Sequence, residues 1–89
     1  MATIFIRHRV TDYGRWRRAY DDFDADCRGM GVTGQAVYQL AGDPNDLTVS
    51  HDFATIESAR AFAASGRLRE VNQMSGVASA PDIWFTERT

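Results

Sequence analysis

Lysine is absent from this chain, cysteine occurs once, and no long apolar run is present. All ten basic residues are arginine, so a Schiff base with a substrate carbonyl cannot form on a lysine side chain. Because Cys27 is alone, the chain can form neither an intrachain disulfide nor a cluster of thiolates around a metal ion. Its spacing places Cys27 on the apolar face of a helix, where we expect a small buried group.

The lack of a long apolar run also bears on where the protein works. No stretch approaches the length of a spanning helix, and residues 1–10 carry arginines where a signal peptide would be continuously apolar. The chain is 44% hydrophobic with a formal net charge of -2, which is typical of a globular protein and offers little to attract nucleic acid. We therefore expect a cytoplasmic protein with neither a membrane nor a nucleic-acid partner.

The length of the chain limits its core. Its 89 residues suit one domain covering 1–89, and a chain this short buries only about 60–65% of its unfolded surface. Self-association is an obvious way to bury more.

Several common catalytic motifs are missing as well. The chain has no G-x-x-x-x-G-K, H-E-x-x-H or G-x-S-x-G, which excludes phosphate-loop, zincin and α/β-hydrolase chemistry. Residues 29–34 match the letters G-x-G-x-x-G, but that dinucleotide fingerprint follows a strand and opens a helix, whereas here a helix comes first. A metal site needs three or four ligands, and only His8, His51 and Asp52 are candidates. Because alternation along a strand sends Asp52 to the face opposite His51, we predict no metal site.

The periodicity of the apolar residues predicts a regular order of elements. Period-two alternation predicts strands at residues 2–10, 35–40, 47–53 and 83–85. Helical spacing predicts one continuous helix over 13–27, a second over 56–63 and a short third ending at Gly76. Asp12, Thr55 and Ser65 are the expected N-caps, and the turn-forming residues 42–46 join the second and third strands as a hairpin.

This order is the ferredoxin-like βαββαβ plan of the α+β class. Right-handed crossovers give an antiparallel four-stranded sheet in the order 4-1-3-2, with all helices on one face. The expected residues of the other face mix apolar and polar side chains: Phe5, Arg7, Val37, Thr48, Ser50 and Trp84. That mixture suits the sheet of a second copy, so we predict a homodimer.

Two histidines are the most informative polar residues. His8 and His51 each interrupt an apolar strand face, and both should point beneath the helices. The first helix covers this face with a stripe that includes Tyr13, Trp16 and Tyr20, whose polar donors need partners when buried. Hydrogen-bonded core histidines and an ordinary aromatic core remain the structural alternative. A pocket completed by water or ligand is the functional one, and its candidate lining residues are Tyr13, Trp16, Phe23, Tyr38 and Phe62.

Five stretches of the chain resemble a known family. They are His8-Arg9-Val10-Thr11-Asp12-Tyr13-Gly14-Arg15-Trp16, Gly42-Asp43-Pro44-Asn45-Asp46, Ala59-Arg60-Ala61-Phe62, Ser65 with Leu68-Arg69-Glu70, and Gly76-Val77 before Pro81-Asp82-Ile83. Together they span nearly the whole chain, which is similar to the cyclase-like, antibiotic biosynthesis monooxygenase-like branch of the dimeric α+β barrel superfamily. The relatives include cofactor-free monooxygenases, haem-degrading enzymes, polyketide cyclases and stress-induced barrels. The resemblance implies a pocket between sheet and helices, where alternation independently places both histidines.

These observations lead to one favoured function and two alternatives. We expect a cofactor-independent monooxygenase or cyclase of secondary metabolism that acts on an apolar, aromatic or polyketide-like small molecule, with no cofactor. His8 would be the general base, while Tyr20, Trp16 and His51 would orient an oxyanion, which makes His8, Tyr20 and His51 the candidate catalytic residues. The alternatives are a non-catalytic binding or stress-related dimer, favoured by a pocket too small for any ligand, and a haem binder with a histidine axial ligand.

Overall fold

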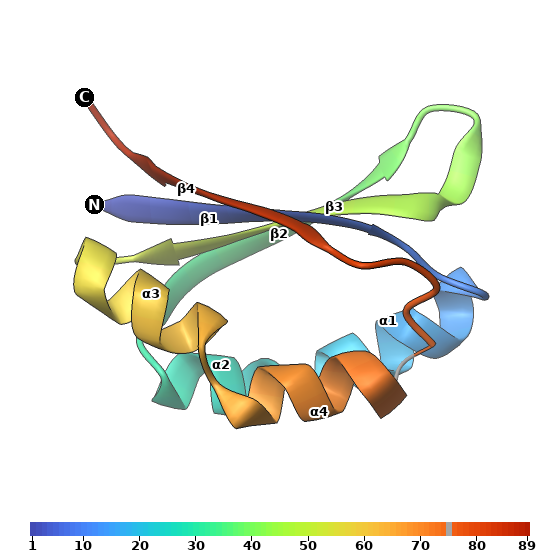
Figure 1. Cartoon of the computed structure of the whole chain (residues 1–89), viewed down its shortest axis with the longest axis horizontal. Helices are drawn as coiled ribbons and strands as arrows, with labels where there is room; N and C mark the ends of the chain where they lie inside the picture. Colours follow the sequence, from blue (N-terminus) through green and yellow to red (C-terminus); the bar gives the residue numbers. More distant parts are fainter. Residues whose placement is uncertain (75) are drawn as a thin grey trace.

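The computed structural model describes residues 1–74 and 76–89 as a four-stranded antiparallel sheet with helices packed on one face (Figure 1). The strands are β1 (Ala2–Arg9), β2 (Val32–Leu40), β3 (Asp43–Phe53) and β4 (Asp82–Glu87). The helices are α1 (Tyr13–Asp22), α2 (Asp24–Gly29), α3 (Ile56–Ala63) and α4 (Gly66–Met74). The sheet order β2-β3-β1-β4 is the predicted order read from the opposite edge, so the ferredoxin-like α+β fold is confirmed.

The pleat of β1 separates a helix-covered face from a helix-free face. Ile4, Ile6 and His8 are buried beneath the helices, whereas Phe5 and Arg7 point to the helix-free face. Because β1 is a central strand paired with both β3 and β4, its alternation determines which residues of the neighbours share each face.

The helix-covered face holds two apolar clusters. The first contains Ala2, Ile4, Ile6, Phe23, Cys27, Val32, Phe53, Ala59, Phe62 and Leu68. The second contains Val10, Trp16, Leu47 and Val49. Cys27 is buried as predicted, and burial raises the pKa of its thiol to about 12, so it is an inert apolar group at neutral pH.

The predicted continuous helix over 13–27 is wrong, because the chain forms two helices that meet at Phe23. Asp12 caps α1 as predicted by accepting from the Arg15 amide at 2.9 Å. The backbone N–H of Phe23 donates to more than one carbonyl of the last turn of α1, including those of Ala19 and Tyr20. The helix ends at this shared hydrogen bond. The acidic run Asp21-Asp22-Phe23-Asp24 favours such a break, since aspartate forms helix interiors poorly.

The hairpin between β2 and β3 is longer than predicted, and its tip bends away from the helices (Figure 1). β3 already begins at Asp43, so the turn narrows from residues 42–46 to Ala41 and Gly42. Gly42 has a φ of +89°, a conformation that suits glycine in tight turns. The N-cap of α3 is confirmed, because the Thr55 hydroxyl accepts from the Ser58 amide at 3.2 Å.

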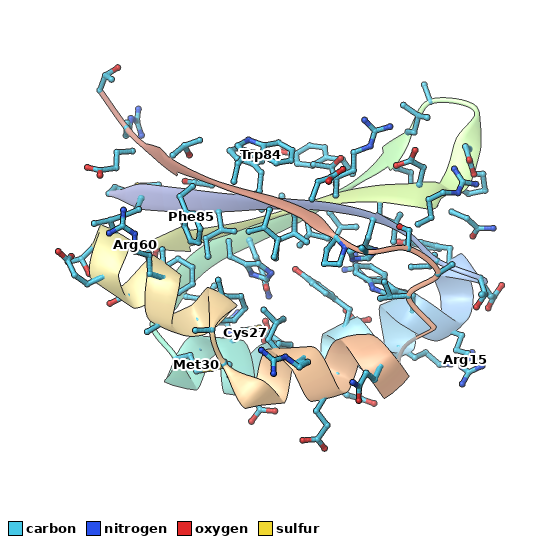
Figure 2. All side chains as sticks on the ribbon, in the orientation of Figure 1. Arg15, Cys27, Met30, Arg60, Trp84 and Phe85 are labelled. Carbon is cyan, nitrogen blue, oxygen red and sulfur yellow. The ribbon has the colours of Figure 1, made fainter. Side chains whose placement is uncertain are left out.

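The helix-free face carries apolar rings beside an ion pair. Trp84 lies on this face and Phe85 on the helix side of β4 (Figure 2). The ring of Phe5 stacks on Trp84 with centroids 5.7 Å apart. The Arg7 guanidinium donates to both carboxylate oxygens of Asp46, at 3.1 and 2.9 Å. The predicted placement of Phe5, Arg7, Thr48, Ser50 and Trp84 on one face is confirmed.

The predicted faces of Val37 and Tyr38 are wrong, because each lies on the opposite side of the sheet. Val37 pairs with Val49 and packs in the second core cluster, while Tyr38 lies on the helix-free face and is 58% exposed. The cause is a register shift between Val32 and Gly34. One extra residue in a strand moves every later side chain to the other face.

Within 1–74 and 76–89, none of the helices combines the length and apolar character needed to cross a bilayer. Over the same ranges, no three His, Cys, Asp or Glu side chains lie close enough together to hold a metal ion.

Candidate functional site

A small cavity lies between the sheet and the helices, where the two core clusters meet. Its volume is about 30 Å³. The lining side chains come from β1, α1, β3, α4 and the break between α1 and α2: Ile6, His8, Trp16, Tyr20, Phe23, Val49, His51, Leu68 and Val71. A space of this size holds a water molecule but no aromatic ligand.

His8 is 5% exposed and projects from β1 toward the cavity. Its Nδ1 is buried and has no hydrogen-bond partner among the described residues. The imidazole ring lies 5.8 Å from the Trp16 ring, centroid to centroid. Burial lowers the pKa of His8, and both the Arg9 backbone and the Asp46 carboxylate oppose that fall.

His51 is 3% exposed and reaches the same cavity from β3. Its Nδ1 is also buried without a hydrogen-bond partner in the described part of the chain. Its ring centroid lies 4.9 Å from that of Phe62 and 6.2 Å from that of Tyr20. Burial lowers the pKa of His51 to about 4, so this imidazole is neutral at pH 7.

The two histidines mark opposite ends of the cavity. His8 pairs with Leu47 and His51 pairs with Ile4, so four residues of β1, roughly 13 Å, separate them along the sheet. Side chains that stand perpendicular to a sheet cannot both ligate one ion over that span. Each unpartnered Nδ1 has a cost of about 1–3 kcal/mol that a water or ligand atom would relieve.

Tyr20 is held by a chain of hydrogen bonds that leads to the surface. Its hydroxyl donates to Gln35 Oε1 at 2.9 Å, and Gln35 Nε2 in turn donates to Asp24 Oδ1. The other Asp24 oxygen accepts from Arg28 Nε at 2.9 Å. Burial raises the pKa of Tyr20 far above its usual value, so the hydroxyl keeps its proton and directs it at Gln35.

Gln35 is a site residue that sequence reasoning missed. Strict alternation from Val32 would place Gln35 on the helix-free face, and the bulge before Gly34 turns it toward Tyr20 instead. A Cβ at position 34 would lie only 2.9 Å from Asp52 Oδ2, so glycine leaves room for the Asp52 carboxylate there.

The predicted lining residues fall into three groups. Trp16 and Phe23 line the cavity, and the Trp16 ring stacks on Tyr20 with centroids 4.9 Å apart. Tyr13 and Phe62 stand behind this layer, Tyr13 at 6.2 Å from the Trp16 ring. Tyr38 is on the other face of the sheet, so its predicted place in the interior is wrong.

A larger groove adjoins the cavity where α4 approaches the residues that lead into β4. Its volume is about 410 Å³, within the range of about 300–1,000 Å³ usual for small-molecule pockets. Its lining residues are Ala63, Leu68, Arg69, Gln73, Val77, Pro81 and Ile83. Leu68 lines both spaces and is therefore the wall between them.

Comparison with known proteins gives structural matches only. No protein-family model matches the chain, and no curated protein matches it by sequence. A solved structure described as an antibiotic biosynthesis monooxygenase superposes with a TM-score of 0.77 at 6% identity, covering 100% of this chain and 99% of that one. SnoaB, a cofactor-independent oxygenase from Streptomyces nogalater, gives a TM-score of 0.76 at 11% identity over 99% of this chain and 94% of its own.

A third match was solved with a ligand. The monooxygenase from the gene ActVA-Orf6 of Streptomyces coelicolor, in complex with nanaomycin D, gives a TM-score of 0.70 at 12% identity, covering 99% of this chain and 87% of that one. These likenesses establish the fold. It is the fold that the sequence resemblance implied, that of antibiotic biosynthesis monooxygenase-like proteins.

Proposed function

We propose that this protein binds an apolar aromatic or polyketide-like molecule between its sheet and helices and converts it as a cofactor-independent monooxygenase or cyclase. One observation carries the proposal: His8 and His51 both line the cavity beside the stacked rings of Trp16 and Tyr20, and the buried Nδ1 of each has no hydrogen-bond partner among the described residues. Polar atoms without partners at an aromatic cavity suit a ligand that supplies oxygen atoms.

His8 is the better general base of the two histidines. Its neutral imidazole can accept a substrate proton, and the nearby Asp46 carboxylate stabilises the imidazolium that results. His51, with its pKa lowered to about 4, stays neutral and can donate a hydrogen bond to an oxyanion. Tyr20 donates to Gln35, so its contribution is to position the Trp16 ring on which it stacks.

The chemistry proceeds from the deprotonated substrate. Removal of an acidic C–H or O–H proton by His8 leaves a delocalised anion, with its negative charge on an oxygen beside His51. In the oxygenase reaction this anion reduces dioxygen and bonds to it through carbon, and the proton held by His8 completes a hydroperoxide. Cleavage of the O–O bond with loss of the remaining hydrogen on that carbon leaves a carbonyl and releases the second oxygen atom as water. In the cyclase reaction the carbanion attacks a carbonyl of the same molecule, and the alkoxide that forms takes up the proton held by His8. SnoaB is described as a cofactor-independent oxygenase, and we extend that chemistry to this chain as part of the proposal.

The size of the cavity defines what binding requires. A volume of about 30 Å³ excludes an aromatic molecule until Leu68 moves and joins the cavity to the groove of about 410 Å³. The same small volume favours the second candidate, a non-catalytic binding or stress-related dimer whose interior is filled by side chains. A haem binder with a histidine axial ligand is the third candidate, and it requires the layers to separate further still.

We also propose that the protein is a homodimer joined through the helix-free face. Phe5 and Trp84 form an apolar stack there, and Tyr38 adds a third exposed ring. A second copy of the sheet would bury these rings together.

Dioxygen uptake tests the leading proposal. The wild-type protein is incubated with hydroxylated naphthalenes and anthrones, and oxygen consumption and cyclised products are followed beside a His8→Gln control. Turnover that depends on His8 supports the enzyme. Neither turnover nor binding of any compound favours the non-catalytic dimer, and a Soret band in the purified protein favours the haem binder.

A further inference from the structure

The groove between α4 and the start of β4 and the interior cavity have one lining side chain in common. Leu68 contributes to both linings, and Val71, one helical turn further on, faces the cavity. Arg69 and Gln73 line the groove. One face of α4 therefore closes the proposed reaction site, and the adjoining face presents polar groups to the exterior.

The groove is apolar except at that polar edge. Its other lining residues are Ala63, Leu68, Val77, Pro81 and Ile83. Arg69 and Gln73 are four residues apart, which places their Cβ atoms about 5–6 Å from each other on one side of the helix. A guanidinium and an amide at that spacing can each donate to one oxygen of a carboxylate.

Among the described residues, neither acid of β4, Asp82 or Glu87, lines the groove. Asp82, next to Ile83, lies opposite Arg7 in the register of β1 and β4 and so belongs to the helix-free face. Arg69 makes no salt bridge among the described residues. The groove thus combines a wide apolar floor with an accessible positive charge at its rim.

We propose that this groove is the access route and acid-binding subsite for the ligand, and that the ligand is a planar aromatic molecule carrying a carboxylate. This inference rests on the proposed function, because it supplies the route to the cavity beneath His8 and His51. The carboxylate is held by Arg69 and Gln73 at the rim. The ring system lies on the apolar floor, and its far end displaces Leu68 to reach the cavity.

The experiment compares two planar ligands of nearly the same size and shape, one with a negatively charged carboxylate and the other with a neutral amide in its place. Anthraquinone-2-carboxylate and the neutral anthraquinone-2-carboxamide are titrated against the protein, and quenching of tryptophan fluorescence reports binding. The chain has two tryptophans. A Trp84→Phe background leaves Trp16 as the reporter, in the wall of the cavity. We expect the carboxylate to bind about two- to fivefold more tightly than the amide, the range of a partly exposed ion pair, and this preference should shrink at high salt.

Substitutions at Arg69 and Leu68 test which residue is responsible for the carboxylate preference and which controls access to the cavity. Arg69→Gln should abolish the preference for the carboxylate, and Arg69→Lys should keep most of it. Arg60→Gln is the matched control, because Arg60 is exposed on α3 and does not line the groove (Figure 2). Leu68→Val, which thins the wall with a small change in packing, should raise the association rate constant of both ligands several-fold.

The outcomes separate this inference from the proposed function. Quenching of Trp16 by both ligands with equal affinity, unchanged by Arg69→Gln, overturns the acid-binding subsite and leaves the interior pocket in place. An association rate that Leu68→Val does not alter overturns the access route. Absence of Trp16 quenching by either ligand overturns the inference together with the pocket on which it rests.

Discussion

The buried imidazole of His51 should make the stability of this protein strongly dependent on pH. Burial lowers the pKa of His51 from 6.5 to about 4, so the unfolded chain binds this proton more tightly than the folded one. At about 1.4 kcal/mol for each pH unit, that fall corresponds to about 3 kcal/mol of unfolding free energy. The contribution is fully present above about pH 6.5, declines as the pH falls and is lost by about pH 4.

Urea unfolding near pH 7 and near pH 5 measures this effect. We expect His51 to account for a loss of about 2 kcal/mol in the unfolding free energy between the two conditions. His51→Gln retains a polar side chain but cannot take up a proton, so this variant should lack that part of the loss. Protein concentration is kept constant, because unfolding of a dimer depends on it.

A control variant and a lower limit on pH isolate the contribution of His51. His8→Gln is the matched control, since it removes the other buried imidazole, whose pKa burial also lowers, and leaves the contribution of His51 in place. The comparison is made no lower than about pH 5, because carboxylates also begin to take up protons below that pH and lower the unfolding free energy. Asp46 is one of these, since the hydrogen bond from Arg7 lowers its pKa. A His51→Gln variant that loses as much stability as the wild type would refute the reasoning.

Three further predictions follow from the site and the sheet. If the protein is an enzyme, His8→Gln should reduce its rate by about 10²–10⁴ with the melting temperature little changed, and undiminished turnover in steady-state assays would reject His8 as the base. Trp84→Asp should convert a homodimer into monomers in sedimentation at micromolar concentration, because it places an unpaired carboxylate in the proposed interface, whereas a wild-type monomer would contradict the dimer itself. Gln35→Leu should lower the unfolding free energy by about 0.5–1.5 kcal/mol by leaving the partly buried Tyr20 hydroxyl without its acceptor. Tyr20→Phe in the Gln35→Leu background should recover part of that loss, and no recovery would show that the hydrogen bond is not its source.

The sequence alone determined the fold and the placement of the two histidines. Strand alternation is a local property of an extended backbone, so β1 and β3 could be assigned from the spacing of their apolar residues. Their side-by-side pairing follows from the right-handed crossover rule, which holds for nearly all such connections. The predicted position of His8 and His51 beneath the helices is therefore confirmed.

Only the tertiary structure decided the remaining details of the site. The bulge before Gly34 reversed the faces of Val37 and Tyr38 and turned Gln35 toward Tyr20. A bulge depends on how two strands pair, so the pattern of apolar residues in one strand does not predict its position. The volume of the cavity depends likewise on how Leu68 of α4 packs against the sheet layer, a contact between residues far apart in the sequence. Local preferences select strands and helices, whereas the space left between the layers is set by the packing of side chains from all of them.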